Sequence, residues 1–368
     1  MNSGAYLGCL LAGVLLLSAG LILLLAGPAG RWGLLDLPST RKHHRQPVPL
    51  VGGIAIWAAF TIGLLLKPES LPDYGFLLGG MTLMTLLGLL DDIHPLSPWF
   101  RLLFQVLAVL LMGLADHAVL TNLGNLLGSG DILLTHAAWL FTLFAVVGLI
   151  NAFNMMDGVD GLAGGQALIA TGWLVLMGFH APLRVEARLE SLLILAMAIA
   201  GFLLFNLRHP GRARASVFMG DAGSNLLGFV LAWFLIRMSQ GEARELDPIT
   251  AVWLLALPLM DTVAVMIRRL MAGRSPFAAD RQHLHFLLLG YGWSQVRAVA
   301  ILLLIAFGLG GLGVLAQWFG VPEYLRFYAL VVVFLLYFAM TTRMVQVLRN
   351  RLVIGTQDRR RLSTPKSS

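Results

Sequence analysis

The chain has 368 residues, of which 58% are hydrophobic and only 12% are charged. Soluble domains carry about 25% charged residues, so the composition excludes a soluble globular enzyme, a disordered chain and a disulfide-rich secreted module. For a chain this apolar, the net charge of +7 raises the question of membrane sidedness before that of nucleic-acid binding.

Eleven apolar runs follow one another along the chain, and a membrane span needs about 20 such residues. The runs lie at about 6–26, 50–66, 75–90, 99–115, 136–153, 162–180, 190–207, 222–237, 249–267, 297–318 and 325–342. Because lipid offers no hydrogen-bond partner for unpaired backbone N–H and C=O groups, these runs are expected to be helices. The predicted fold class is an all-α polytopic integral membrane protein with about eleven transmembrane helices.

The loops between the runs predict the orientation. When successive loops are assigned to alternate sides, 20 of the 26 Lys and Arg residues share one side, which the positive-inside rule makes cytoplasmic. The N-terminus is then periplasmic and the C-terminus cytoplasmic. We expect residues 118–135 to form a short external hairpin, residues 1–355 to form a single transmembrane domain, and the basic residues 356–368 to be a disordered cytoplasmic tail.

Nearly all polar residues of chemical interest lie on the predicted cytoplasmic side. The first group is the basic loop 41–45. Its members Lys42 and Arg45 could hold a phosphate, or the loop could be a positive-inside flank that contacts anionic headgroups. Asp91 and Asp92 end the third run, where acids oppose the helix dipole and lie close to hydrocarbon. A pair of carboxylates suits Mg²⁺, which takes oxygen ligands and leaves room for substrate phosphates, although a water-exposed acid pair is the alternative.

A second group follows the fifth run. Asn151, Asn154 and Asp157 have the spacing i, i+3, i+6 and can share one helix face. Asp160 comes next, among glycines that let a ligand or a neighbouring helix approach closely. Because polar side chains are costly at a membrane boundary, this pattern favours a ligand site over simple packing.

The remaining groups lie at the start of the eighth run and after the ninth. Asp221 could be a helix cap, but it shares its membrane side with the other polar groups. Arg281, His283 and His285 lie in a loop, where histidines two residues apart do not match the zinc motif HExxH. Carboxylates and amides beside basic groups predict Mg²⁺, with Mn²⁺ as the alternative, together with a polyphosphate. Since the site adjoins the bilayer, one substrate is expected to be a lipid and nucleic acid is not expected as a partner.

The segments LVGG, GLLDD, NAFNMMDGVDGLAGG, VFMGDAGS and DRQHLH follow in order over roughly residues 30–300. Together they resemble the polyprenyl-phosphate N-acetylhexosamine-1-phosphate transferase family, of the WecA and TagO type and more distantly the MraY translocase. One position departs from the family, since Phe286 stands where the loop often has a third histidine.

The resemblance implies a role for each matching residue. It implies Asp91, Asp92, Asp157, Asp160 and His283 as catalytic residues, Asp221, Asn154 and Asp92 as metal ligands, and Lys42, Arg45, Asn151, Asp160, Arg281, His283 and His285 as substrate-binding residues.

The resemblance also implies an activity. A UDP-N-acetylhexosamine would donate its sugar 1-phosphate, most simply N-acetylglucosamine 1-phosphate, to undecaprenyl phosphate. This reaction would release UMP and begin a lipid-linked envelope glycan such as O-antigen in a bacterial inner membrane; a homodimer is left open. The alternatives are a phospho-N-acetylmuramoyl-pentapeptide translocase or, from another class, a transporter or flippase for phosphorylated lipid.

Overall fold

The computed structural model describes residues 3–38, 46–67, 71–116, 118–181, 185–209, 211–212, 214–241, 244–276 and 281–363. Its helices are α1 (Ser3–Ala26), α2 (Gly52–Leu65), α3 (Leu71–Ile93), α4 (Pro98–Asp116), α5 (Ala138–Met156), α6 (Leu162–His180), α7 (Glu186–Asn206), α8 (Gly220–Ser239), α9 (Pro248–Leu254), α10 (Ala256–Met271), α11 (Leu284–Gly290), α12 (Gln295–Trp318) and α13 (Glu323–Ser363). Two short 3-10 turns, η1 (Pro28–Trp32) and η3 (Thr135–Ala137), and an antiparallel pair of strands, β1 (Leu35–Asp36) and β2 (Val48–Pro49), connect them.

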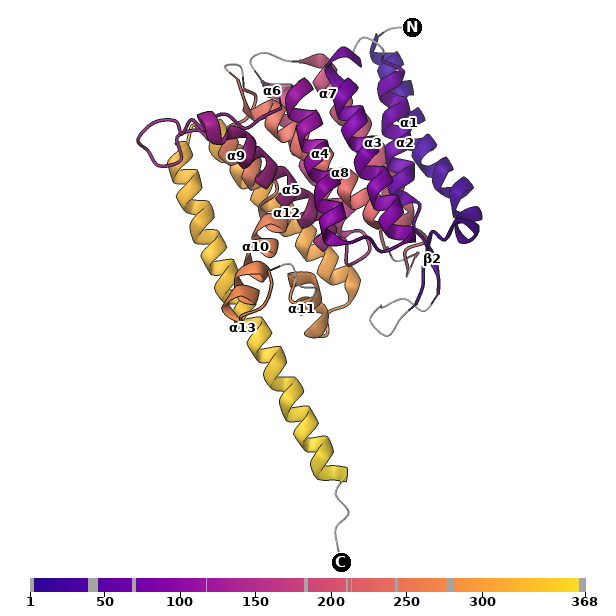
Figure 1. Cartoon of the computed structure of the whole chain (residues 1–368), viewed down its shortest axis with the longest axis vertical. Coiled ribbons are helices and arrows are strands. Elements are labelled where there is room, and N and C mark those ends of the chain that lie inside the picture. Colours follow the sequence, from indigo (N-terminus) through magenta and orange to yellow (C-terminus); the bar gives the residue numbers. More distant parts are fainter. Residues whose placement is uncertain are drawn as a thin grey trace, which may run out of the picture.

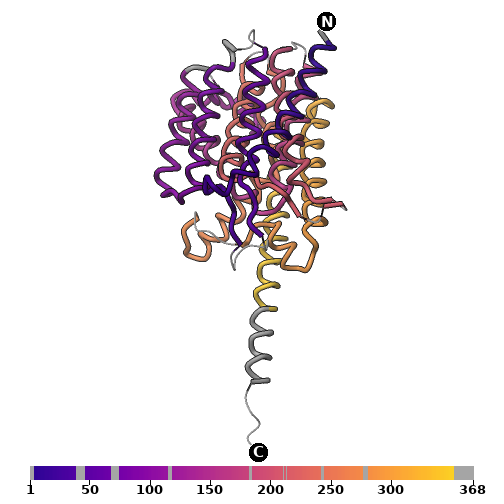
Figure 2. Tube along the Cα trace, turned by 90° about the vertical axis from the view of Figure 1, so that its right-hand side faces the viewer, coloured from indigo at the N-terminus to yellow at the C-terminus, as the bar shows by residue number. Residues whose placement is uncertain are grey.

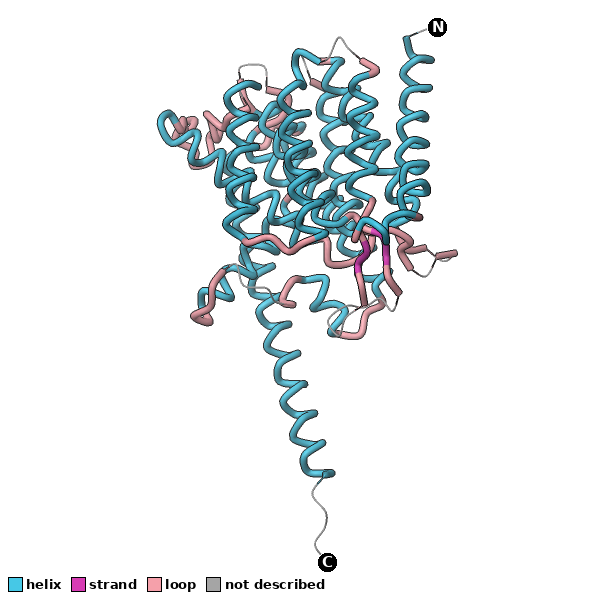
Figure 3. The backbone as a smooth tube through the Cα atoms, turned by 45° about the vertical axis from the view of Figure 1, so that its right-hand side comes forward, coloured by secondary structure: helices cyan, strands magenta, loops and turns pink. Residues whose placement is uncertain are grey.

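The long helices stand side by side in one bundle, with the N-terminus at one end and the strands and the short helix α11 at the other (Figures 1 and 3). The helix α8 lies at the centre, where it packs against α2, α3, α5 and α6. Its apolar residues surround the whole helix, as expected of a helix buried on every side. The helix α13 runs past the end of the bundle, as the view turned by 90° also shows (Figure 2).

Each of the eleven predicted apolar runs is helical over most of its length, which confirms a mostly helical polytopic membrane protein. Among the described residues, eight helices are long and apolar enough to cross a membrane, and a bent pair makes a ninth. The apolar helices α2 and α4 are shorter than the others. The number of spans and their orientation stay predictions.

The bent pair is α9 and α10, which the sequence presents as one continuous run. The two helices meet at Leu255 with an angle of 80° between them. Proline has no backbone N–H, so Pro258 cannot bond to the carbonyl of Leu254 four residues earlier, and the helix breaks. The side chain of Gln166 in α6 donates to that carbonyl at 3.4 Å, which gives the released oxygen a partner.

The predicted external hairpin lies at the end of the bundle where α13 begins. Its chain doubles back at an antiparallel bridge between Asn122 and Leu133. Gln240, just after α8, accepts from the backbone of Thr121 and Asn122 at 3.0 Å each, and Glu323 of α13 accepts from Asn125 N at 2.9 Å. The hairpin therefore ties the ends of α8 and α13 together.

The helical assignment of α13 continues to Ser363, into the segment for which the sequence predicts disorder. Residues 364–368 lie outside the described part of the chain. The single-domain boundary and the disorder of the tail stay predictions.

Candidate active site

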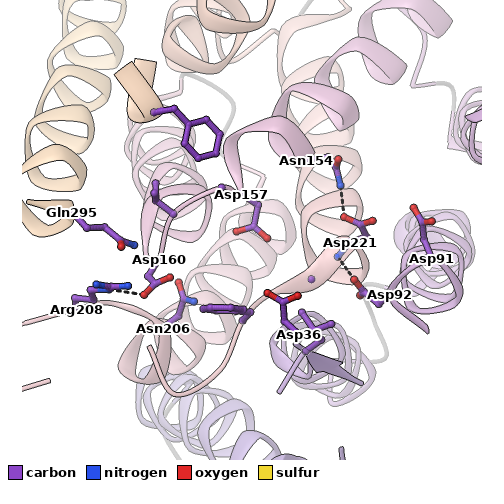
Figure 4. Close-up of a pocket in the computed structure, with 16 residues that line it drawn as sticks. Asp36, Asp91, Asp92, Asn154, Asp157, Asp160, Asn206, Arg208, Asp221 and Gln295 are labelled. Atoms are coloured by element: carbon purple, nitrogen blue, oxygen red, sulfur yellow. Dashed lines mark hydrogen bonds and ion pairs between the residues drawn. The ribbon is translucent and has the colours of Figure 1, made fainter. Parts of the chain in front are cut away.

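A cavity of about 450 Å³ opens at the bundle end that contains β1 and β2. Six aspartates line it, and the one cationic side chain among its described lining residues is that of Arg208 (Figure 4). The lining residues are Asp36, Leu50, Asp91, Asp92, Asn154, Asp157, Gly158, Val159, Asp160, Asn206, Arg208, Phe218, Gly220, Asp221, Phe286 and Gln295. The cavity thus brings together acids that lie almost 190 positions apart in the sequence.

The ends of α3 and α8 meet through Asp92. Its two carboxylate oxygens accept from the backbone N–H groups of Asp221 at 2.9 Å and Ala222 at 3.2 Å. Gly220 begins α8 with a φ of +72°, and a Cβ there would lie 2.5 Å from Oδ2 of Asp92. Only glycine meets both conditions, since it accepts positive φ and has no side chain.

The end of α5 brings an amide and an acid to the same place. Asn154 donates from Nδ2 to Oδ1 of Asp221 at 2.6 Å and to Oγ of Ser224 at 3.1 Å. Asp157 follows directly after α5. Burial raises the pKa of Asp157 well above its ordinary value, and the negative charges of Asp221, Asp92 and Asp160 add smaller contributions in the same direction. Crowding of this kind favours either a proton or a bound cation.

Asp160 lies on the opposite wall, in an ion pair with Arg208. The guanidinium Nε donates to Oδ2 of Asp160 at 2.5 Å (Figure 4). Asn206, at the end of α7, accepts from Gly161 N at 2.7 Å and donates to the carbonyl of Val217 at 2.8 Å. It thereby joins the 157–161 turn to the segment that leads into α8.

Asp91 faces the corner between α3 and α4. Its carboxylate accepts from Leu96 N at 2.7 Å and from Nη1 of Arg101 at 3.0 Å. Asn151 lies near the same corner, where its Nδ2 donates to Oε1 of Gln105 at 3.1 Å, and it does not line the cavity. A substrate-binding role for Asn151 stays a prediction.

The strands β1 and β2 close one side of the cavity. Asp36 pairs with Val48, and the carbonyl of Pro49 accepts from Phe218 N at 2.9 Å, which fixes the hairpin to the segment before α8. The basic loop lies between these strands, and Lys42 and Arg45 fall outside the described residues.

The predicted histidine loop lies beside the cavity. His283 and His285 are buried and are absent from the described lining, while the next residue, Phe286, is part of it. Arg281 lies over the Phe286 ring at 5.9 Å and is likewise absent from the described lining. Burial lowers the pKa of His285 to about 4, so its imidazole is neutral near pH 7.

Six of the twelve residues proposed from sequence line the cavity: Asp91, Asp92, Asn154, Asp157, Asp160 and Asp221. His285 packs against the lining residue Phe286 from behind. Sequence reasoning missed Asp36, Arg208, Asn206 and Gln295 as lining residues. The signal for Asn206 and Arg208 was present, because an amide and a cation end an apolar run on the predicted cytoplasmic side.

Comparison with known proteins adds independent information. Residues 74–239 match the model of glycosyl transferase family 4, a stretch that contains Asp91, Asp92, Asn154, Asp157, Asp160 and Asp221. The chain is 38% identical over 315 residues to the undecaprenyl-phosphate alpha-N-acetylglucosaminyl 1-phosphate transferase of Escherichia coli O157:H7, covering 84% of each chain. The chain belongs to this transferase family.

Two further relatives bear the same name. That of Yersinia pestis is 37% identical over 306 residues, 83% of each chain. That of Haemophilus influenzae is 32% identical over 325 residues, 88% of this chain and 91% of the relative. These matches cover most of each chain, so the matched region includes the helices of the bundle as well as the residues that line the cavity.

Proposed function

We propose that the protein transfers N-acetylglucosamine 1-phosphate from UDP-N-acetylglucosamine to undecaprenyl phosphate and releases UMP. The observation that carries the proposal is a polar, acid-lined cavity at one end of an apolar bundle, in a chain whose relatives are named for this transfer. A water-soluble nucleotide sugar and a lipid phosphate both reach such a position. The relatives' names favour N-acetylglucosamine over the muramoyl-pentapeptide donor, and the product would begin an envelope glycan such as O-antigen.

A divalent cation, Mg²⁺ or Mn²⁺, is part of the proposal, and the side chains of the cavity fit it. Six carboxylates against one guanidinium leave an excess of negative charge where two phosphorylated substrates must bind. Among the described residues, no three His, Cys, Asp or Glu side chains already form a metal-binding group. Mg²⁺ commonly binds one or two carboxylates and completes its shell with water and substrate phosphates, so a partial protein shell suits it.

Asp221, Asn154 and Asp92 would hold the cation, because they meet where α3, α5 and α8 end or begin. When bound, it would neutralise charge on the donor diphosphate, the main requirement of phosphoryl transfer. Arg208 would bind a donor phosphate and Asp160 would orient the Arg208 guanidinium. The helix ends hold these groups in fixed positions. Such positioning of reacting groups supplies much of the rate enhancement in catalysis.

In the reaction, an oxygen of the lipid phosphate attacks the β-phosphorus of the donor. A new phosphorus–oxygen bond forms to the lipid, the bond to the bridging oxygen breaks, and UMP leaves with that electron pair. The second pKa of a phosphate monoester is about 6, so the nucleophile is largely a dianion at pH 7. A general base is therefore not required, and Asp91 is free to position the acceptor.

The membrane arrangement completes the proposal. The eleven predicted spans are α1 to α8, the pair α9 and α10, α12 and α13, with the N-terminus periplasmic and the cavity at the cytoplasmic face of a bacterial inner membrane. Support comes from the end of the bundle that holds the cavity, since it also holds Arg101, Arg208 and Arg212. The homodimer has no support in the described residues and stays a prediction.

The test is UMP release by the purified protein with undecaprenyl phosphate, Mg²⁺ and a panel of labelled UDP-sugars. We expect release with UDP-N-acetylglucosamine and with no other donor at a comparable rate. Release only with the muramoyl-pentapeptide donor would assign the translocase reaction. No release with any donor, together with lipid movement across reconstituted vesicles, would replace the enzyme with a flippase.

A further inference from the structure

Asp261 is a buried acid of α10 that the proposed reaction does not use. Its Oδ2 accepts from Nδ1 of His283 at 2.8 Å, and its Oδ1 accepts from Leu284 N at 3.0 Å and from the hydroxyl of Tyr337 at 2.7 Å. All three donors come from outside α10: His283 directly precedes α11, Leu284 begins α11 and Tyr337 belongs to α13. One carboxylate thus joins the broken span, the loop and the last long helix.

These contacts fix the histidine in one form. A carboxylate only accepts hydrogen bonds, so Nδ1 of His283 carries the proton. The bond to Leu284 N holds the first residue of α11, where a negative charge is favourable beside the free N–H groups. Asp261 therefore holds both His283 and Leu284, the two residues that precede His285.

His285 continues this support toward the cavity. Its ring stacks on His283 with 5.8 Å between centroids and 10° between planes. Its Nε2 is buried and has no hydrogen-bond partner among the described residues. A Cβ on Gly158 would lie 2.6 Å from that Nε2, so the ring packs directly against the turn between Asp157 and Asp160.

A second contact links α13 to the same loop. Arg268, also buried, donates from Nη1 to Oγ1 of Thr341 at 2.8 Å and from Nη2 to the carbonyl of Gln282 at 2.9 Å. Arg268 of α10 thus holds the carbonyl of the residue before His283 and is itself bonded to Thr341 of α13. The buried hydrogen bonds of Asp261 and of Arg268 Nη1 and Nη2 favour this one arrangement, because a displacement would leave their partners unpaired.

We infer that Asp261, together with Tyr337, is a positioning residue for catalysis: it holds His283 and the start of α11 so that His285 supports the 157–160 turn. This inference rests on the proposed function, since that turn carries two of the cavity's acids. Asp261, His283 and His285 are themselves absent from the described lining of the cavity. They act through the position of Asp157 and Asp160.

The test compares two hydroxyl deletions that each remove a hydrogen bond between α13 and the bent span, one at α10 and one at α9. Tyr337→Phe removes the bond to Asp261, while Thr250→Val removes the bond that Nη1 of Arg326 makes at 2.7 Å near the opposite end of the bent span. UMP release gives kcat and KM, and hydrogen exchange followed by mass spectrometry reports on the 157–161 peptide. Exchange does not depend on turnover, so it separates this inference from the proposed function.

Losing one hydrogen bond should lower kcat about five-fold in Tyr337→Phe, with KM little changed. Asp261→Asn should lower it about 100-fold, as expected when reacting groups are displaced. In both variants the 157–161 amides should exchange faster, and in Thr250→Val both kcat and this exchange should match the wild type. If Asp261→Asn does not fold, the other two variants still decide.

Two results would overturn the inference. One is equal loss of kcat in Tyr337→Phe and Thr250→Val, which would mean that any contact between these helices matters. The other is unchanged exchange of the 157–161 peptide in Tyr337→Phe and in Asp261→Asn. If the wild type releases no UMP, the proposed function fails, and the exchange data alone then show whether Asp261 holds the turn.

Discussion

Asp92 at the end of α3 accepts the backbone N–H of Asp221 at the start of α8, at 2.9 Å, so one acid of the site caps the helix that carries another. Asp92→Ala should therefore destabilise the protein by about 1 kcal/mol, the usual cost of a lost helix cap. It should also reduce UMP release to near background. Thermal unfolding and UMP release on the same preparation measure the two effects.

Ser294 provides the matched control, because it caps α12 by accepting from Arg297 N outside the described cavity lining. Ser294→Ala should lower the unfolding temperature without altering kcat. Equal loss of activity in both variants would show that cap stability alone explains the effect of Asp92.

Mg²⁺ should raise the unfolding temperature of the wild-type protein, because a ligand that binds only the folded state stabilises it. Asp221→Asn should lose both this response and turnover, whereas Asp131→Asn should keep both. Asp131 is the control because it lies in the hairpin at the other end of the bundle, bonded to Asn122. The same shift with and without Asp221 would place the cation elsewhere.

Arg208→Gln should raise the KM for the UDP-sugar about ten-fold, because a charge-assisted contact to phosphate is lost. The KM of Arg208→Lys should lie between those of the wild type and Arg208→Gln, since lysine keeps the positive charge but lacks the planar guanidinium. The control is Arg212→Gln: Arg212 bonds to the carbonyl of Leu204, stacks on Phe205 and is absent from the described lining. A KM increase of the same size in the Arg212 variant would show that the loss of any positive charge near the cavity, and not a specific contact of Arg208, raises KM.

Gly158→Ala should abolish most activity, because the added Cβ would lie 2.6 Å from His285 Nε2 and 3.1 Å from the Phe286 ring. Gly148, in α5 just before the same motif, has no atom within 4 Å of an added Cβ. Gly148→Ala should then leave activity intact and stabilise the helix by up to about 1 kcal/mol. Steady-state UMP release by both purified variants tests the contrast.

Protonation of His285 should contribute to acid destabilisation. Its folded pKa is about 4, below the ordinary 6.5, so the unfolded chain binds the proton first as the pH falls. The stability from neutral His285 is complete above pH 6.5 and declines from there toward pH 4. Unfolding temperatures between pH 7 and 4.5 should fall less steeply in His285→Gln; equal slopes would contradict the shift.

The positions of most helices along the chain could be predicted from sequence. A helix that faces lipid must be apolar, so the helices appear as apolar runs separated by polar loops. The break at Leu255 could not, although Pro258 was its visible cause. Membrane helices often keep a proline without breaking, and whether a partner such as Gln166 receives the freed carbonyl depends on tertiary packing.

The acids of the site could be predicted for a similar reason, since charge is so rare in this chain that Asp91, Asp92 and Asp221 stand out. Their partners could not. Arg208 resembles any positive residue on a cytoplasmic flank, and its pairing with Asp160 arises only when α6 and α7 pack together. A substrate-binding role for His283 and His285 stays a prediction; in the described cavity the neighbouring Phe286 belongs to the lining.

The broken span has a consequence for drug discovery. Because the Asp261 contacts lie beside the cavity and involve α13, a small molecule that separated α13 from α10 would disable the enzyme without resembling a nucleotide or a sugar. Such an inhibitor would not compete with UDP-N-acetylglucosamine. It should bind Tyr337→Phe more tightly than the wild type, because the contact that it must break is already missing there.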